Sequence, residues 1–272
     1  MKELIHTYGE HRNLQGIASL PEKLDSKRPA VLLLNAGVVH KVGPFDFNVS
    51  FARLLSADDY LVFRFDLNGM GDSAKIKDGS LHNESVMNDI KATLSFLQSQ
   101  YGIDQFVVIG LCTGADHAHK IACEDSRVIG NVWLDGYGYT TWKFTFLRLL
   151  PVLLNPKRLA FAIINRIKNR KQLIKKARGV NAYVWELPEK EKYLNDMQLL
   201  DKRGFKCLYI YSGGVKKYYN YKNQFNDSFK GQAFLKNIDV EYYPQFDHTY
   251  TILKDRQQMM ARVNKWLNTY FS

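Results

Sequence analysis

Apolar residues along this chain fall into two patterns. Short continuous apolar runs are typical of strands buried on both faces of a sheet, whereas apolar positions three or four residues apart indicate one face of a helix. The continuous runs and other β-type stretches predict strands at 2–8, 12–19, 30–34, 60–65, 106–109, 128–134, 207–211 and 240–243.

Helical spacing is clearest at 83–100, before the predicted strand at 106–109. One face there carries Val86, Ile90, Leu94 and Leu97. The predicted helices are at 45–55, 83–100, 115–123 and 252–266. Because strands alternate with helices, we expect an α/β fold with a mostly parallel central sheet, flanked by helices and joined by right-handed crossovers. In such sheets, functional residues gather at the carboxyl ends of the strands.

The alternation is interrupted once, between residues 140 and 202. This stretch is helix-like and basic, and it contains Pro151, Pro156 and Pro188. A structureless loop of that length is uncommon in a compact domain, so we interpret it as a helical cap inserted over the strand ends. The predicted organisation is a core formed by 1–139 and 203–272, with the cap at 140–202.

The net charge of +11 is confined to one part of that cap. Residues 143–178 contain no Asp or Glu and hold 11 of the 38 Lys and Arg residues, so the rest of the chain has 38 − 11 = 27 basic residues against 27 acidic ones. Two kinds of partner fit this basic, apolar segment: an anionic membrane surface and an acidic carrier such as an acyl-carrier protein or coenzyme A. A solvated helix face is the plainer interpretation. Nucleic acid is not expected, because no recognisable binding module is present.

Composition and cysteine usage indicate a globular protein in a reducing compartment. The chain is 46% hydrophobic and has no run as long as a membrane-spanning helix. Its first residues lack the apolar region of a secretory signal. The three cysteines are odd in number and have no metal-ligand spacing. We therefore expect a cytoplasmic protein, at most peripheral at the inner membrane, with no metal and no cofactor.

The pentad Gly110–Gly114, Gly-Leu-Cys-Thr-Gly, is the strongest candidate for chemistry. It lies between a predicted strand and a predicted helix, as a nucleophile elbow does, with Cys112 at the apex. A strained apex residue needs glycines two positions away, since a Cβ would crowd the turn. The helix that follows points its positive end at the apex, which favours a thiolate and an oxyanion. A buried structural cysteine is the alternative.

Three further post-strand loops could complete such a site. Asp66–Ser73 has the form D-x-x-G-x-G-x-S, and Asn35–His40 follows the first long strand. His248 lies between the last strand and the last helix, where it is the candidate general base or imidazolium partner of Cys112. The remaining member of a triad is less obvious. Asp135, at the end of the strand 128–134, is the best candidate acid, although a turn or cap aspartate is an equal interpretation.

These motifs together resemble the α/β-hydrolase superfamily over nearly the whole chain. Residues 34–44 and Gly110-Leu111-Cys112 look more narrowly like a bacterial branch that includes hydrolases associated with exosortase and exopolysaccharide gene clusters. The resemblance implies Cys112 as nucleophile, His248 as base, and an oxyanion hole formed by the backbone amide of Thr113 with that of Gly37 or Val38. It also places the acid after the penultimate strand, where residues 211–221 contain no carboxylate.

The predicted function follows from the resemblance to this superfamily and from the positions at which the chain differs from its usual pattern. A cysteine in place of serine makes a cysteine-dependent acyl hydrolase or acyltransferase the expected activity, with a free or carrier-bound ester or thioester as substrate. A Cys–His pair can also act without a carboxylate. The alternative is a non-catalytic binding or accessory protein in polysaccharide or lipid assembly. Candidate substrate-binding side chains are His40, Tyr137, Tyr218 and Tyr219.

Overall fold

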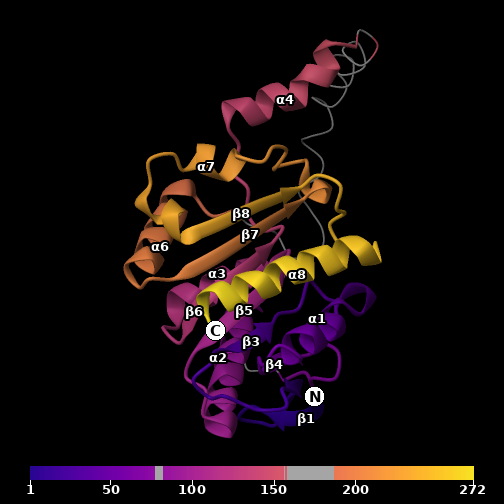
Figure 1. Ribbon diagram of the computed structural model, residues 1–272, viewed down its shortest axis with the longest axis vertical. Helices are drawn as coiled ribbons and strands as arrows, with labels where there is room; N and C mark the ends of the chain where they lie inside the picture. The colour runs from indigo at the N-terminus through magenta and orange to yellow at the C-terminus, as the bar shows by residue number, and fades with distance from the viewer. Residues whose placement is uncertain (77–81, 156, 158–186) are drawn as a thin grey trace.

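The structure is a computed structural model that describes residues 1–76, 82–155, 157 and 187–272. One eight-stranded sheet runs through it in the order β1-β2-β4-β3-β5-β6-β7-β8 (Figure 1). The strands are β1 (Lys2–Tyr8), β2 (Leu14–Leu20), β3 (Ala30–Leu33), β4 (Val62–Asp66), β5 (Phe106–Leu111), β6 (Val128–Leu134), β7 (Lys206–Ser212) and β8 (Ile238–Tyr243). Neighbours from β4 to β8 are parallel, whereas β2 is antiparallel to both β1 and β4. The prediction of a mostly parallel sheet is confirmed.

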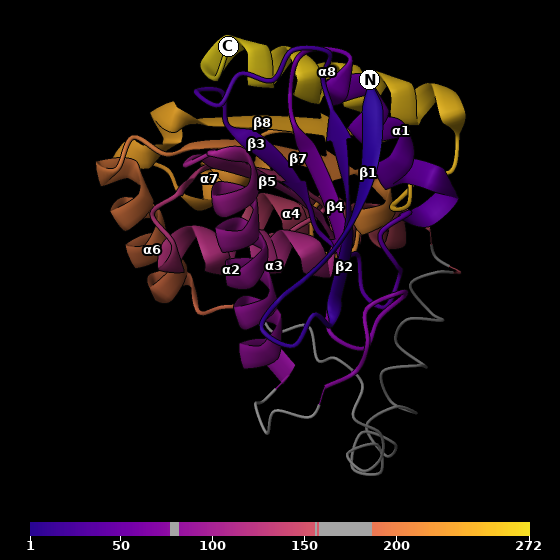
Figure 2. The ribbon, with the colours of Figure 1, turned by 90° about the horizontal axis from the view of Figure 1, so that it is seen from below.

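Helices cover both faces of the sheet, as the alternating pattern predicts. On one face, α2 (His82–Tyr101), α3 (Thr113–Glu124) and α6 (Lys190–Lys202) contribute to one buried core. On the other face, α1 (Phe47–Ser56) and α8 (Leu253–Tyr270) contribute to the second core. Figure 2 shows α1 and α8 on one side of the strands and α2, α3 and α6 on the other. The continuous apolar runs of β3 and β5 are buried along their full length, because both faces of the sheet are covered.

Four short elements of the described chain lie in the connections between the strands and the longer helices. They are the 3-10 helices η1 (Pro44–Asp46), η2 (Gly213–Val215) and η3 (Ala233–Asn237), and the helix α7 (Gln224–Ser228). Among the residues that the structure describes, no helix is both long and apolar enough to cross a membrane.

The helix α4 (Trp142–Leu153) begins the segment predicted as a cap. Figure 1 shows α4 well apart from the sheet. Thr141 caps its first turn by accepting a hydrogen bond from the Phe144 amide, and Phe144 is buried while Trp142 is 80% exposed. The part of the predicted cap at 156 and 158–186, with eight of the eleven basic residues of the 143–178 segment, lies outside the described residues. The roles of the cap and of its positive charge therefore stay predictions.

Parallel strands place their carboxyl ends at one edge of the sheet. The turns after β3, β5, β6, β7 and β8 all leave from that edge, and they carry the residues singled out by the sequence. This arrangement brings residues far apart in the chain within contact distance, as the site shows.

Candidate active site

The turn between β5 and α3 presents the sulfur of Cys112. Its backbone has φ 56° and ψ −116°, a conformation that is costly for a residue with a side chain. A Cβ on Gly110 would lie 2.1 Å from the carbonyl oxygen of Gly114, and a Cβ on Gly114 would lie 2.8 Å from that of Asn35. Both glycines are therefore required by close backbone approach, and the turn leaves Cys112 partly exposed.

The imidazole of His248 reaches this turn from the loop after β8. Its Nδ1 lies 2.8 Å from Oδ2 of Asp135, whose carboxylate is fully buried. Hydrogen bonds with Asp135 and then with Cys112 raise the pKa of His248 to about 10 from its usual 6.5. The imidazole is therefore protonated at neutral pH. Because Nδ1 contacts the carboxylate, Nε2 is the nitrogen left for the sulfur.

Asp135 is held by the strand next to its own. It has φ 54° directly after β6, a left-handed conformation that aspartate tolerates better than most residues. The amide of Ser212 donates to Oδ1 at 2.6 Å, and the Ser212 hydroxyl donates to Oδ2 at 2.6 Å. Tyr218 Oη donates to the Asp135 carbonyl oxygen at 3.0 Å. These bonds fix a buried carboxylate that faces the imidazole.

Residues 211–221 contain no carboxylate, but Ser212 among them binds one from the end of the neighbouring strand. Ser212 ends β7, the strand that precedes the loop in which the resemblance places the acid. The structure has a serine there, and that serine binds the aspartate supplied by β6. The sequence indicated Asp135 but gave no signal for Ser212, because their contact depends on the pairing of β6 with β7.

The elbow and the loop next to it in the fold hold the backbone amides that the sequence predicted as oxyanion donors. Thr113 is the first residue of α3, where N–H groups have no acceptor within the helix. The Gly37 amide donates to the Thr113 hydroxyl at 2.6 Å, so it is occupied. The Val38 amide has no acceptor among the described residues. Of the two alternatives in that loop, the geometry leaves Val38 as the free donor.

A buried ion pair supports the loop that carries Val38. The carboxylate of Asp66, at the end of β4, accepts hydrogen bonds from the Lys41 amide and the Lys41 Nζ, each at 2.6 Å. It also accepts from the Asp72 amide at 3.0 Å, and Lys41 Nζ binds the Asp72 carboxylate as well. Burial lowers the pKa of Lys41, but the hydrogen bonds to Asp66 and Asp72 outweigh it and raise the pKa overall. The D-x-x-G-x-G-x-S motif thus anchors the 35–41 loop.

These residues surround a pocket of about 370 Å³. Its lining consists of Cys112, Thr113, Asp135, Gly214, Val215, Tyr218 and His248. Of the four side chains predicted to bind substrate, only Tyr218 is among them.

The other three predicted substrate contacts lie elsewhere. Tyr219 is fully buried and stacks on Tyr211, with ring centroids 3.7 Å apart. Tyr137 is buried against Trp133 beneath the 135–139 turn. His40 is exposed, and its Nδ1 accepts from the amide of Val42 at 3.3 Å. These three side chains are not among the residues that line the pocket of Cys112, and their contact with a substrate stays a prediction.

Comparison with known proteins agrees with this architecture. Residues 29–157 match the family described as alpha/beta hydrolase fold. An esterase from Pyrococcus furiosus has 16% sequence identity and a TM-score of 0.61, over 100% of this chain and 91% of that chain. A serine hydrolase without a lid, from Xanthomonas campestris, has 12% identity and a TM-score of 0.60, over 100% of this chain and 96% of that one. No curated protein sequence matches. The α/β-hydrolase fold predicted from the four motifs is confirmed.

The three cysteines provide an internal test of the site's electrostatics. Cys112 is partly exposed beside a protonated imidazole, whereas burial raises the pKa of Cys123 to about 12 and also raises that of Cys207. Because the thiolate is the nucleophile, iodoacetamide at neutral pH should label Cys112 about 100-fold faster than the other two. Peptide mass spectrometry over time measures this. Faster labelling of Cys123, or a Cys112 rate unchanged in His248→Gln, would contradict the assignment.

The raised pKa of His248 also predicts a pH-dependent stability. A group whose pKa is higher in the folded state stabilises the fold fully below its unfolded pKa of 6.5, and this contribution disappears as the pH rises through about 10. The difference in unfolding free energy between the wild type and His248→Gln should therefore be largest at about pH 6 and small above about pH 10. Urea unfolding across this range measures it. A difference independent of pH would mean that the folded-state pKa is not raised.

The ion pair beneath the 35–41 loop predicts a large loss of stability when it is broken. Lys41→Met leaves the fully buried Asp66 carboxylate without its cation, which should cost about 3–5 kcal/mol. Asp72 is the matched control, because its carboxylate is 67% exposed, and Asp72→Asn should cost less than about 1 kcal/mol. Urea unfolding of both variants measures the difference. Equal losses would show that Asp66 is not the carboxylate that needs Lys41.

Proposed function

Because the chain has the α/β-hydrolase fold, with its carboxyl-edge residues arranged as described, we propose that it is a cysteine-dependent acyl hydrolase or acyltransferase acting on esters or thioesters. One observation carries the proposal. A buried Asp135 binds Nδ1 of His248, and the other side of that imidazole serves a sulfur held on a strained turn in a pocket. In this arrangement each of the three groups contacts the next in a fixed orientation.

The first half of the proposed reaction transfers the acyl group to sulfur. The Cys112 thiolate attacks the carbonyl carbon, a C–S bond forms, and the carbonyl π electrons move to oxygen. The amides of Thr113 and Val38 donate to this oxyanion. When the tetrahedral intermediate collapses, the bond to the leaving alkoxide or thiolate breaks. The imidazolium of His248 gives its Nε2 proton to that leaving group, and an acyl-cysteine remains.

The second half releases the acyl group. His248 is now neutral, so it takes a proton from water or from an acceptor alcohol as that oxygen attacks the thioester carbonyl. Collapse breaks the C–S bond and regenerates the thiolate beside an imidazolium. Asp135 keeps the ring in one orientation and favours its charged form throughout. Water as the acceptor gives hydrolysis, and an alcohol gives transfer.

Two features favour cysteine chemistry over a binding role. The first is the contact of Asp135 with His248, which supplies a carboxylate from the end of β6. The absence of a carboxylate after β7 was the main argument for a non-catalytic protein, and this contact answers it. An imidazolium with a pKa of about 10 also suits a cysteine partner, because a positive charge beside sulfur favours the thiolate form. A serine hydroxyl in its place would need a neutral imidazole as base.

The finer classification rests on sequence and surface. Residues 34–44 and Gly110-Leu111-Cys112 support a place among bacterial exosortase- and exopolysaccharide-associated hydrolases. The exposed apolar and basic side chains of α4 support an apolar acyl chain presented at an anionic surface. These include Trp142, Lys143, Phe146, Arg148 and Leu153.

The acyl-enzyme is the species that tests the proposal. Incubation with activated esters and with acyl-thioester probes should add one acyl group per chain, located on Cys112 by peptide mass spectrometry. Cys112→Ala should give no adduct. His248→Ala should slow acylation by about 10²–10⁴-fold, the range that a positioned proton donor contributes.

Cys123→Ser is the matched control, since it removes a different thiol and leaves the pocket intact. It should be acylated at the wild-type rate. If no donor acylates Cys112, or if the adduct forms equally on Cys123 or Cys207, the proposed activity is wrong and the fold assignment stands alone.

A further inference from the structure

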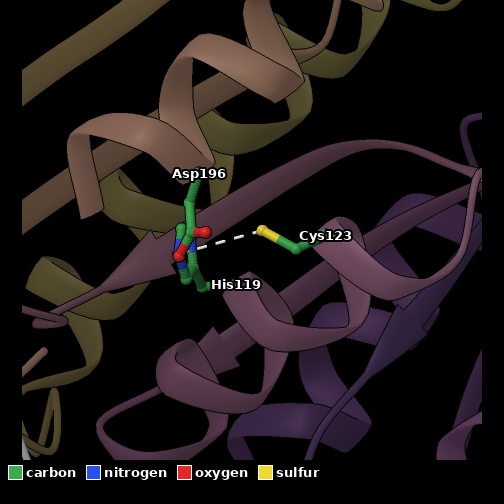
Figure 3. Close-up of side chains that lie close together, drawn as sticks. All are labelled: His119, Cys123 and Asp196. Atoms are coloured by element: carbon green, nitrogen blue, oxygen red, sulfur yellow. Dashed lines mark hydrogen bonds and ion pairs between the residues drawn. The ribbon is translucent and has the colours of Figure 1, made fainter. Parts of the chain in front are cut away.

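A second cluster of polar side chains lies on the same helix as the elbow, away from the pocket of Cys112. His119 and Cys123 are one turn apart on α3, and Asp196 reaches them from α6 (Figure 3). Nε2 of His119 is 3.0 Å from Oδ2 of Asp196 and 3.9 Å from Sγ of Cys123. One ligand-type atom from each residue lies within 4.8 Å of the others.

The geometry differs from that of the first site in a way that matters for chemistry. Asp135 binds Nδ1 of His248 and leaves Nε2 for sulfur, so a proton can be passed across the ring. At the second cluster, the carboxylate and the sulfur both face Nε2 of His119. An imidazole cannot relay a proton between two groups on the same nitrogen. Three donor atoms within 4.8 Å of one another are instead grouped as ligands are around a cation.

The imidazole of His119 is held in a fixed orientation. Its side chain is only 4% exposed, and its ring lies 5.2 Å from both Tyr193, on which it stacks, and Trp133, which it meets edge-on. Nδ1 is buried and has no hydrogen-bond partner among the described residues. The Asp196 carboxylate can only accept, so without a metal it favours the ring proton on Nε2, and the unpartnered Nδ1 can take that proton when a cation binds. A proton on Nδ1 leaves the Nε2 lone pair directed at the cluster.

A cavity of about 190 Å³ opens at this cluster, so an ion can enter. The surrounding charged groups are Lys120 and Glu124 on α3, Lys192 and Asp196 on α6, and Arg203 just beyond α6. Glu124 is paired with Lys91 at 2.7 Å, and Arg203 donates to the carbonyl oxygens of Ala122 and Val128. Asp196 is therefore the carboxylate that faces the imidazole and the thiol.

We infer that His119, Cys123 and Asp196 form a binding site for a divalent transition-metal cation of the zinc class, with water or another small ligand in the fourth position. Zinc bonds are about 2.0 Å to nitrogen and oxygen and about 2.3 Å to sulfur. With those lengths, the observed separations correspond to S–Zn–N and N–Zn–O angles of about 130° and about 97°, on either side of the tetrahedral value. A thiolate with an imidazole excludes Mg²⁺ and Ca²⁺, which prefer oxygen ligands.

Binding is coupled to loss of the Cys123 proton. Burial, followed by the charge of Asp196, raises the pKa of the Cys123 thiol to about 12, so the sulfur is protonated in the metal-free protein at neutral pH. On binding, the S–H bond breaks, the proton leaves to solvent, and both S–H electrons form the bond to the metal. One ion then links α3, which carries the elbow, to α6.

From the sequence we predicted the opposite, that no metal is bound. That expectation rested on the absence of metal-ligand spacing among the three cysteines. The partners of His119 found in the structure are one turn onward and 77 residues away, and the second of these depends on how α6 packs against α3.

Cobalt(II) provides a direct test, because a bound thiolate gives a near-ultraviolet charge-transfer band and a tetrahedral ion gives visible bands. The full-length protein, reduced and freed of metal by a chelator, should bind one Co²⁺ with both signals, and Zn²⁺ should displace it. Both Cys123→Ser and Asp196→Asn should weaken Zn²⁺ binding more than about 100-fold, because outer-shell changes alone cost about 10–100-fold. Asp196→Asn is isosteric at a side chain that is 24% exposed, so it should fold.

Two variants separate this inference from the proposed activity. Glu124→Gln changes a carboxylate that lines the same cavity but is already paired with Lys91, and it should bind Zn²⁺ as the wild type does. Cys112→Ser removes the proposed nucleophile and should keep the cobalt–thiolate band. If no such band forms, or if it is lost in Cys112→Ser and kept in Cys123→Ser, the site is not a metal site.

Discussion

The hydrogen bond between Asp135 and His248 is the contact on which the candidate site depends. It joins the end of β6 to the loop after β8, and it does so across β7, whose Ser212 also binds the carboxylate. The fully buried carboxylate fixes one imidazole nitrogen and raises the imidazole pKa to about 10. Without this contact, Cys112 would be an ordinary thiol on a strained turn. With it, the sulfur lies beside a cation whose position is determined by three strands.

The candidate site also depends on the backbone geometry of the Cys112 turn and of the 35–41 loop. The turn at Cys112 requires the close approach of Gly110 to Gly114 and of Gly114 to the 35–41 loop. That loop is held by the Thr113 hydroxyl on one side and by the buried Asp66 and Lys41 pair on the other. The loop and the elbow are thus held together before any substrate binds. Preorganised amide donors lower the free energy of a developing oxyanion without a cost of reorganisation.

Much of this could be predicted from the sequence, because local patterns reported on local structure. Continuous apolar runs indicated the buried strands, and glycines on either side of Cys112 indicated the elbow. Contacts set by strand pairing left no local signal. Ser212 as the partner of Asp135, and Asp196 as the partner of His119, depend on the packing of β6 with β7 and of α3 with α6. Tyr219 is a related case, since its ring stacks on Tyr211 in the aromatic core, whereas the neighbouring Tyr218 lines the pocket.

The pKa of His248 is the quantity that tests the account most directly. Proton and nitrogen NMR of its imidazole across pH should show titration at about 10 in the wild type. The midpoint should move well down toward the ordinary value of 6.5 in Asp135→Asn, and part of the way in Cys112→Ala. An imidazole that titrates near 6.5 in all three proteins would contradict the account, because neither the carboxylate nor the sulfur would then be acting on it.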